Sequence, residues 1–274
     1  MAIENALGSG LGLLNKKAVI TGGAVNIGAA ISRRLAELGV VTAIVYNYSS
    51  SAADKLVAEI EEVGGTAAAF QADVADAVSM AELFAGIEED PRFGRVDIMV
   101  NNSGIFSMSE QTDLSAEEWQ RLFNINTMGV FLGAREAAKL MKSQPALDGE
   151  ASRGVIINMA SINALHPGFG QTVHYDATKG AVHAFTRSFA AELGPHSVRV
   201  NAVAPGLVDS EGLRDTAGPL AEMVEGRNPL SLVDGSSPLV KASDVANAVV
   251  FLSSSLAAAV TGETLVVDRG YLLT

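Results

Sequence analysis

The chain has 274 residues, of which 48% are hydrophobic, and a formal net charge of -12. This length allows a large α/β domain with a substantial core. An acidic chain repels phosphate backbones, so we expect no nucleic-acid partner. Cysteine is absent, which excludes disulfides and thiol chemistry, and the four histidines lack paired metal-ligand spacing, so we expect no metal site.

The first segment, residues 1–14, contains Glu4 but no lysine or arginine, and so lacks the basic region of a signal peptide. We expect it to be a partly ordered leader ahead of one domain over residues 15–274. No uncharged apolar run reaches membrane-spanning length. The sequence therefore predicts a cytoplasmic protein without a membrane partner.

Short apolar segments alternate with helical patterns along the chain. In order, we expect strands at 17–21, 41–46, 67–71, 96–101, 154–158, 198–203 and 264–268, with helices between them at 27–38, 51–63, 78–89, 116–141, 175–193 and 242–252. Strands that are apolar throughout are typical of a parallel sheet buried on both faces. The alternation predicts a single-domain α/β fold, a Rossmann-type doubly wound parallel sheet flanked by helices.

One long stretch, 207–241, breaks this alternation and is rich in glycine and proline. It follows a strand at the sheet edge where doubly wound folds bind ligands. Long irregular segments in compact domains are usually functional, so we predict a lid over the ligand site.

A glycine-rich turn, Thr21 to Gly28, joins the first strand to the first helix of the alternation. Glycines let the backbone approach a pyrophosphate closely, and a helix N-terminus offers free N–H groups and a positive dipole end. The alternative is a plain glycine-rich turn. The strand–turn–helix context favours a nucleotide site.

Tyr175 and Lys179 lie four residues apart, which places them on one face of a helix. An ammonium held close to a phenol favours the phenolate and lowers the tyrosine pKa, so the tyrosine can act as a general acid or base. The alternative is a surface pair with no chemical role.

Together these motifs resemble the short-chain dehydrogenase/reductase family over nearly the whole chain. The family's glycine motif is TGxxxGxG, which Thr21, Gly22 and Gly28 match. Asn26 stands where the middle glycine is expected. Asparagine is the residue after glycine that best tolerates a positive φ, so we expect the turn to survive.

Further motifs extend the resemblance. Asp73 matches the acidic residue near the adenine, 101–104 matches the NNAG motif with Ser103 in place of alanine, and Pro205 and Gly206 match the PG motif. Ser210 stands where a threonine usually meets the nicotinamide carboxamide. The resemblance and the adjoining loops predict cofactor contacts at Thr21, Gly22, Asn26, Ile27, Gly28, Tyr48, Ser49, Ser50, Asp73, Val74, Asn101, Ser103, Gly104, Tyr175, Lys179, Pro205, Gly206, Val208 and Ser210.

The segment after the second strand bears on the choice between NAD and NADP. An acid at this point usually binds the ribose hydroxyls of NAD, and none stands within 46–51. Ser49 and Ser50 could donate hydrogen bonds to a 2′-phosphate, which favours NADP. Val25, at a position that is often basic in relatives that bind NADP, points the other way, and helix capping by the serines is compatible with either cofactor. NAD therefore stays open.

The resemblance also implies catalytic roles. Tyr175 would be the general acid, Lys179 would lower its pKa and hold the nicotinamide ribose, and Ser161 would hydrogen-bond the substrate oxygen. Asn126 would hold a water in a proton relay with Lys179. The implied activity is NAD(P)H-dependent reduction of a small-molecule ketone to a secondary alcohol, or the reverse.

The substrate pocket is expected near Ile105, Phe106, Met108 and the loop 162–174. We expect His174 to face solvent, although it could tune Tyr175 or bind a polar substrate group. Two alternatives to the ketone reductase remain. One is a non-catalytic dinucleotide-binding sensor or scaffold, and the other is an enoyl reductase, a class that usually spaces tyrosine and lysine six residues apart.

The resemblance implies a homo-oligomer, a dimer or a homotetramer, in which helices 116–141 and 175–193 pair across a two-fold axis. The apolar residues of the second helix could equally pack on their own sheet.

Overall fold

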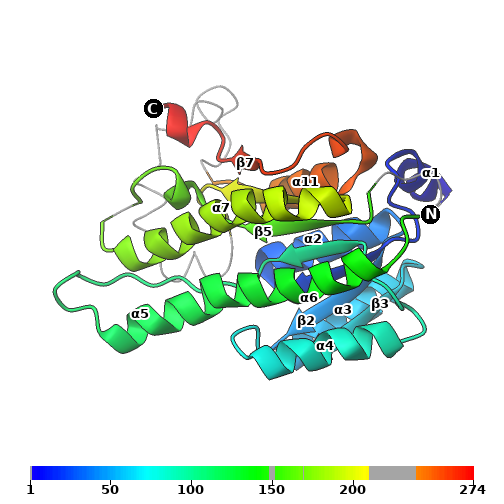
Figure 1. The fold of residues 1–274 in the computed structure, drawn as a ribbon, viewed down its shortest axis with the longest axis horizontal. Helices are drawn as coiled ribbons and strands as arrows, with labels where there is room; N and C mark the ends of the chain where they lie inside the picture. Colours follow the sequence, from blue (N-terminus) through cyan, green and yellow to red (C-terminus); the bar gives the residue numbers. More distant parts are fainter. Residues whose placement is uncertain (1, 148–151, 169, 210–238) are drawn as a thin grey trace.

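The computed structural model of the chain describes residues 2–147, 152–168, 170–209 and 239–274 (Figure 1). Its strands are β1 (Lys17–Thr21), β2 (Val41–Tyr46), β3 (Ala67–Gln71), β4 (Ile98–Asn101), β5 (Gly154–Met159), β6 (Val198–Pro205) and β7 (Thr264–Val267). Its α-helices are α1 (Ala2–Gly10), α2 (Asn26–Glu37), α3 (Ser50–Glu62), α4 (Ala77–Glu89), α5 (Ala116–Phe123), α6 (Gly129–Ser143), α7 (Val173–Leu193) and α11 (Ala242–Ser253).

The seven strands form one sheet in the order β3-β2-β1-β4-β5-β6-β7, and every neighbouring pair is parallel. The predicted doubly wound α/β fold is therefore confirmed. The chain reverses its direction of winding between β1 and β4. In such sheets a crevice opens at this switch point, outside the carboxyl ends of the strands, and it is the usual ligand site.

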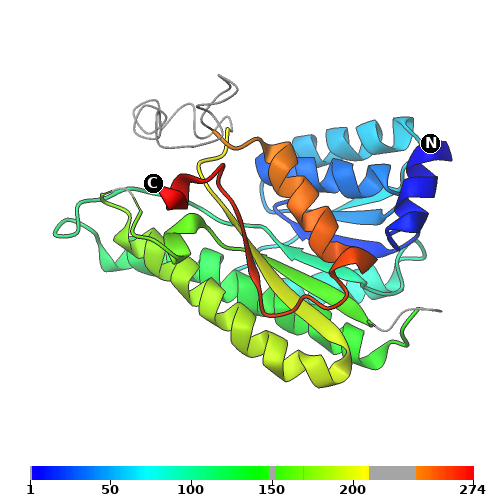
Figure 2. The ribbon, with the colours of Figure 1, turned by 90° about the horizontal axis from the view of Figure 1, so that it is seen from above.

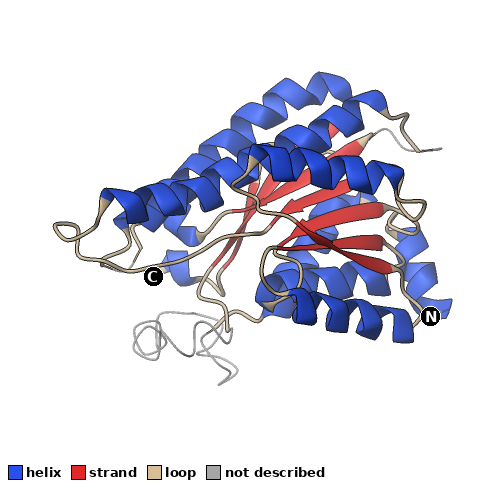
Figure 3. Cartoon of the chain, turned by 90° about the horizontal axis from the view of Figure 1, so that it is seen from below, coloured by secondary structure: helices blue, strands red, loops and turns tan. Residues whose placement is uncertain are grey.

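Helices cover both faces of the sheet, as Figures 2 and 3 show. Because side chains alternate along a strand, neighbouring residues of β1 enter different cores. Val19 packs in a core with residues of α4, α6 and α7. Ile20 packs in a core with residues of α2 and α11. Both residues are fully buried, which explains why the strands are apolar throughout.

The long helix predicted over 116–141 is wrong in one respect. A π-helical segment, Asn124–Met128, separates α5 from α6. Its end carries an i to i+5 bond from the Gly129 N–H to the Asn124 carbonyl. Widened turns of this kind occur often at functional sites, and this one contains Asn126, which is fully buried.

The first segment forms α1, an element that the sequence pattern did not indicate. A Cβ on Gly8 would collide with the backbone of Leu38, so α1 packs closely on the end of α2. Leu13 is fully buried in the core shared with α2 and α11. Residues 210–238, most of the predicted lid, lie outside the described residues, and Ser210 is among them.

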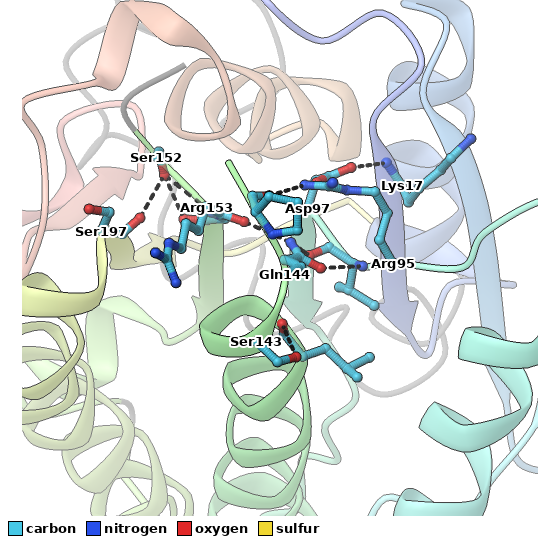
Figure 4. Close-up of polar contacts among 12 residues, drawn as sticks. Lys17, Arg95, Asp97, Ser143, Gln144, Ser152, Arg153 and Ser197 are labelled. Atoms are coloured by element: carbon cyan, nitrogen blue, oxygen red, sulfur yellow. Dashed lines mark hydrogen bonds and ion pairs between the residues drawn. The ribbon is translucent and has the colours of Figure 1, made fainter. Parts of the chain in front are cut away.

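Polar side chains join the amino ends of β1, β4 and β5, at the edge opposite the crevice (Figure 4). The Asp97 carboxylate accepts from the backbone N–H of Lys17 at 2.9 Å and from Arg95 Nε at 2.8 Å. Gln144 Nε2 donates to the carbonyls of Val96 and Arg153, both at 2.8 Å. These bonds fix the start of each strand and hence the position at which it ends in the crevice.

Within the part of the chain that the structure describes, no helix combines the length and the apolar character needed to span a membrane.

Candidate active site

A cavity of about 920 Å³ opens at the carboxyl ends of the strands. Its wall contains most of the predicted cofactor residues. These are Gly22, Asn26, Ile27, Gly28, Tyr48, Ser49, Asp73, Val74, Ser103, Gly104, Tyr175, Lys179, Pro205, Gly206 and Val208. One end of the cavity thus adjoins the glycine-rich turn, and the other adjoins the tyrosine and the lysine.

The glycine-rich turn lines the cavity with Gly22, Gly28 and the residues 25–27. Gly22 has a φ of 61° and Asn26 a φ of 49°, so the asparagine does adopt the left-handed conformation that its position requires. A Cβ on Gly28 would collide with the Gly22 carbonyl and would lie 2.7 Å from Asn102 Nδ2. Val25 caps α2 without a side-chain hydrogen bond, so no side chain at the N-cap position competes for the first amides of this helix.

Thr21 supports this turn from behind and does not line the cavity. Its hydroxyl accepts from the backbone N–H groups of Asn102 and Ser103, at 3.0 and 3.1 Å. Asn102 Nδ2 donates to the carbonyls of Thr21 and Gly22, at 3.0 and 3.2 Å. Asn102 lines the cavity, and we did not single it out from the sequence although it lies inside the NNAG-type motif.

Asn101, in contrast, points away from the cavity. Its Nδ2 donates to Asn158 Oδ1 at 2.9 Å, and Asn158 Nδ2 donates to Thr186 Oγ1 at 2.9 Å. All three side chains are buried. They cross-link β4, β5 and α7, so the structure gives Asn101 a supporting position and no direct access to the cavity.

The segment after β2 also lines the cavity, with Asn47, Tyr48 and Ser49. Tyr48 is 90% exposed, and Ser50, the first residue of α3, does not line the cavity. Ser49 caps α3 without a side-chain hydrogen bond. Among the described residues of the cavity wall, Asp73 is the one carboxylate and Lys179 the one cation.

Three of the four predicted catalytic residues meet at the other end. Tyr175 and Lys179 come from the first two turns of α7, and Lys179 Nζ lies 5.7 Å from the centroid of the Tyr175 ring. The same ammonium donates to the Met159 carbonyl at the end of β5, at 2.8 Å. Ser161 follows β5, is 8% exposed, and accepts from the Asn163 N–H at 3.2 Å.

The pKa of Tyr175 differs from the sequence-based expectation. Burial raises it to about 12, while the hydrogen bond with the Ser161 side chain opposes this and the charge of Asp176 adds to it. Burial also lowers the pKa of Lys179 to about 8. The prediction that the ammonium lowers the Tyr175 pKa is therefore wrong for this pocket, because desolvation of the phenolate is the largest cause and the opposing contribution comes from Ser161.

Asn126 lies behind these residues. Its Oδ1 accepts from the Ile105 N–H at 2.8 Å, and its Nδ2 donates to the Ile105 carbonyl at 2.9 Å and to Thr178 Oγ1 at 3.2 Å. A Cβ on Gly104 would lie 3.3 Å from Asn126 Oδ1 and 3.5 Å from Lys179 Nζ. The side chain of Asn126 thus holds the loop after β4 beside the lysine, and the water relay stays a prediction.

Asp176 anchors the loop that follows Ser161. Its carboxylate accepts from Asn163 Nδ2 at 2.7 Å, from the Gly168 N–H at 3.0 Å and from Thr172 Oγ1 at 3.3 Å. The sequence pattern assigns no role to this residue, although it lies inside the run from Tyr175 to Lys179. An acidic residue directly after the tyrosine is the feature of the sequence that could have identified it.

The predicted substrate wall is present in part. Ile105, Phe106 and Met108 line the cavity with Ile162 and Asn163, whereas the described residues of 164–174 do not. The Phe106 ring meets that of Tyr175 edge to face, with centroids 5.0 Å apart. This contact brings the loop after β4 against the tyrosine.

His174 is fully buried, so the expectation that it faces solvent is wrong. Its Nε2 lies 2.9 Å from Ser107 Oγ, and Ser107 donates to Glu118 Oε1 at 2.6 Å. Glu118 also accepts from Arg121 Nε and Nη2, at 2.7 and 2.8 Å. These bonds to Arg121 and Ser107 lower the pKa of Glu118 to about 2. Ser107 lines the cavity, and His174 does not.

Comparisons with known proteins agree with this geometry. Residues 22–272 match the model of a protein family described as enoyl-(acyl carrier protein) reductase. The chain is 37% identical to a 3beta-hydroxysteroid dehydrogenase of Eggerthella lenta, over 95% of each chain. It is 36% identical to an L-rhamnose 1-dehydrogenase (NAD(P)(+)) of a Sphingomonas species, over 94% of this chain and 96% of that one.

A solved structure is similar over almost the same range. The short-chain dehydrogenase of Burkholderia cenocepacia J2315 in complex with NADP superposes with a TM-score of 0.83 at 33% identity, covering 95% of this chain and 99% of that one.

Proposed function

This chain belongs to the short-chain dehydrogenase/reductase family and is an oxidoreductase of that family; from that premise, we propose that it reduces a ketone to a secondary alcohol, or catalyses the reverse, with NADP(H). One observation carries the proposal. Ser161, Tyr175 and Lys179 converge at one end of a cavity whose other end is lined by the glycine-rich turn.

The turn fits a dinucleotide. Gly28 allows the Gly22 carbonyl to lie where any Cβ would collide with it, which keeps the turn tight, and the N-terminus of α2 has no side-chain cap. In a chain of net charge -12, such local amides and the helix dipole must hold the pyrophosphate. The bound nicotinamide would supply or accept the hydride, and the protein would position and polarise the substrate.

Ser161 can polarise the substrate carbonyl because of how its own bonds are arranged. Its oxygen accepts from the Asn163 N–H, which leaves its proton for the Tyr175 oxygen or for the oxygen of a bound substrate. Such a donor stabilises the negative charge that develops on that oxygen during reduction.

Tyr175 is then the proton donor. With a pKa raised to about 12, the phenol keeps its proton at neutral pH and can give it to the developing alkoxide. Lys179, whose pKa is lowered to about 8, still carries its charge at neutral pH. Its ammonium is held by the Met159 carbonyl beside Gly104, and we propose that it also binds the nicotinamide ribose.

The segment after β2 supports a preference for NADP over NAD. Residues 46–51 contain no acidic side chain, and the Ser49 side chain makes no capping hydrogen bond to the first amides of α3. Free amides at a helix N-terminus can bind a 2′-phosphate. We propose this as the basis of a preference for NADPH.

The test follows cofactor absorbance at 340 nm. Purified protein with NADPH, then NADH, is offered ketones, diketones, steroids, β-ketoacyl thioesters and an α,β-unsaturated thioester. We expect oxidation of NADPH with at least one ketone, and a loss of at least a thousandfold in kcat in Tyr175→Phe with an unchanged cofactor Kd. Turnover that survives in Tyr175→Phe would refute the assignment of the acid. Tight cofactor binding without any turnover would instead favour a sensor.

We also propose a homo-oligomer, in which a second copy of the chain covers the outer faces of α5, α6 and α7. Three large apolar side chains are exposed there, Trp119 by 38%, Met128 by 46% and Phe131 by 39%. Phe131 stands edge to face with Phe185 of α7, with centroids 6.3 Å apart, so the two helices share one apolar surface. Light scattering on wild type and on Phe131→Glu tests it, and a wild-type monomer would contradict it.

A further inference from the structure

Ser107, in the loop after β4, differs from Ser161 in the hydrogen bonds that it makes. Ser107 lines the cavity one residue after Phe106, whose ring contacts Tyr175. A substrate group bound at Ser107 would therefore lie close to the reacting carbonyl. Ser107 is also bonded to two side chains, Glu118 and His174, which determine what it can offer a substrate.

The single proton of Ser107 is already used. Glu118 accepts two N–H bonds from Arg121, so it is held as a carboxylate and can only accept. Ser107 must therefore donate its proton to Glu118, at 2.6 Å. The bond with His174 must run the other way, from Nε2–H to the serine oxygen at 2.9 Å. The network thus assigns the ring proton of His174 to Nε2.

A fully buried histidine with its proton on Nε2 has only an acceptor at Nδ1, and this atom has no hydrogen-bond partner among the described residues. The ring therefore depends on Ser107 for its one hydrogen bond. A serine oxygen has two lone pairs, and one of them receives the His174 N–H. The other lone pair is left for the cavity.

We propose that Ser107 is a hydrogen-bond acceptor, and not a donor, toward the substrate, and so selects ketones that carry a hydroxyl group next to the carbonyl, or the corresponding diols. This inference rests on the proposed function. It assigns opposite polarity to Ser161 and Ser107. Ser161 donates to the carbonyl oxygen, and Ser107 accepts from a neighbouring hydroxyl.

The test compares ketones that differ in one group. In the linear series, hydroxyacetone offers a donor, 2-butanone replaces the hydroxyl by a methyl of similar size, and methoxyacetone offers an acceptor alone. A cyclic series uses the 2-hydroxy, 2-methyl and 2-methoxy derivatives of cyclohexanone. The measured quantity is the ratio of kcat/KM values within a series, so that a general loss of activity cancels.

We expect wild type to prefer the hydroxyketone to the methyl ketone by about tenfold, the size of one net hydrogen bond. Ser107→Ala should lose this preference. The matched control is Ser109→Ala in the same loop, because Ser109 donates to the Glu110 carbonyl and does not line the cavity. It should keep the wild-type ratio.

Glu118→Gln reverses the polarity without removing the serine. A glutamine amide can donate to Ser107 and release the serine proton toward the cavity. The methoxyketone should then gain on the methyl ketone relative to wild type. Thermal unfolding of each variant verifies that it is folded.

A preference that persists in Ser107→Ala, or a wild type that does not distinguish hydroxyl from methyl, would overturn this inference and leave the proposed function intact. If wild type oxidises neither NADPH nor NADH with any ketone, the proposed function fails, and the assignment to Ser107 fails with it.

Discussion

The two ends of the cavity are built in different ways. The end near the glycine-rich turn is shaped by the absence of side-chain atoms, since a Cβ on Gly28 would occupy the space of the Gly22 carbonyl. The end near Tyr175 is shaped by side chains that tie together segments distant in sequence, such as Ser107 and His174. We therefore expect the turn end to be sensitive to added side-chain atoms, and the end near Tyr175 to be sensitive to the loss of hydrogen bonds.

The sharpest way to break the turn end is therefore to add one methyl group. Gly28→Ala should weaken NADPH binding by about a hundredfold, because the turn must move by roughly 1 Å to accept the Cβ. Fluorescence titration of the cofactor measures it. Gly86→Ala in α4 is the matched control, because nothing lies within 4 Å of the Cβ that it adds. Equal cofactor affinity in Gly28→Ala and wild type would show that the close packing of Gly28 against the Gly22 carbonyl does not shape the cofactor site.

Removal of a hydrogen-bond acceptor should destabilise the end of the cavity near Tyr175 and lower activity. Asp176→Ala leaves Asn163 Nδ2, the Gly168 N–H and Thr172 Oγ1 without this carboxylate. We expect the free energy of unfolding to fall by about 2 kcal/mol, and kcat/KM for the ketone to fall by about tenfold, while the cofactor Kd stays the same. Urea unfolding and steady-state kinetics measure these changes.

Glu192→Ala, at an exposed position of the same helix, is the control for Asp176→Ala and should change neither quantity. A large rise in the cofactor Kd of Asp176→Ala would show that the two ends are not independent.

Sequence predicted the two ends unequally, for a physical reason. The turn is a continuous run from Thr21 to Gly28 with a strand before it and a helix after it, so its local pattern contains its structure. Even the substitution at Asn26 could be interpreted correctly, because a positive φ is a property of one residue. The strands and their parallel orientation followed from apolar runs in the same local way.

The substrate end depends on tertiary contacts that no local pattern contains. His174 and Ser107 are 67 residues apart, and nothing in either segment indicates that they meet. The spacing of Tyr175 and Lys179 predicted their shared helix face correctly but not the direction of the tyrosine pKa. That direction depends on burial, which is set by β5, the loop after β4 and α7 together.

The two buried ionisable groups of the site, Tyr175 and Lys179, have well-separated pKa values. Burial lowers the pKa of Lys179 to about 8 and raises the pKa of Tyr175 to about 12. If reduction needs both groups protonated, kcat/KM should be constant at neutral pH and fall above pH 8, by up to tenfold per unit. A pH profile of ketone reduction measures it. A rate that stays constant to pH 10 would contradict the requirement for a charged Lys179.

The smallest expected effect concerns the choice of cofactor at the turn end. Ser49→Asp places a carboxylate at the cavity wall, where it would repel a 2′-phosphate and bind ribose hydroxyls. The ratio of kcat/KM for NADPH over NADH should fall by about fivefold. Because aspartate caps helices as well as serine does, α3 should lose no stability. Ser51→Asp adds the same charge in the first turn of α3 but off the wall, and should leave the ratio near that of wild type. An equal shift in both variants would mean that charge near α3, and not a contact at Ser49, sets the preference.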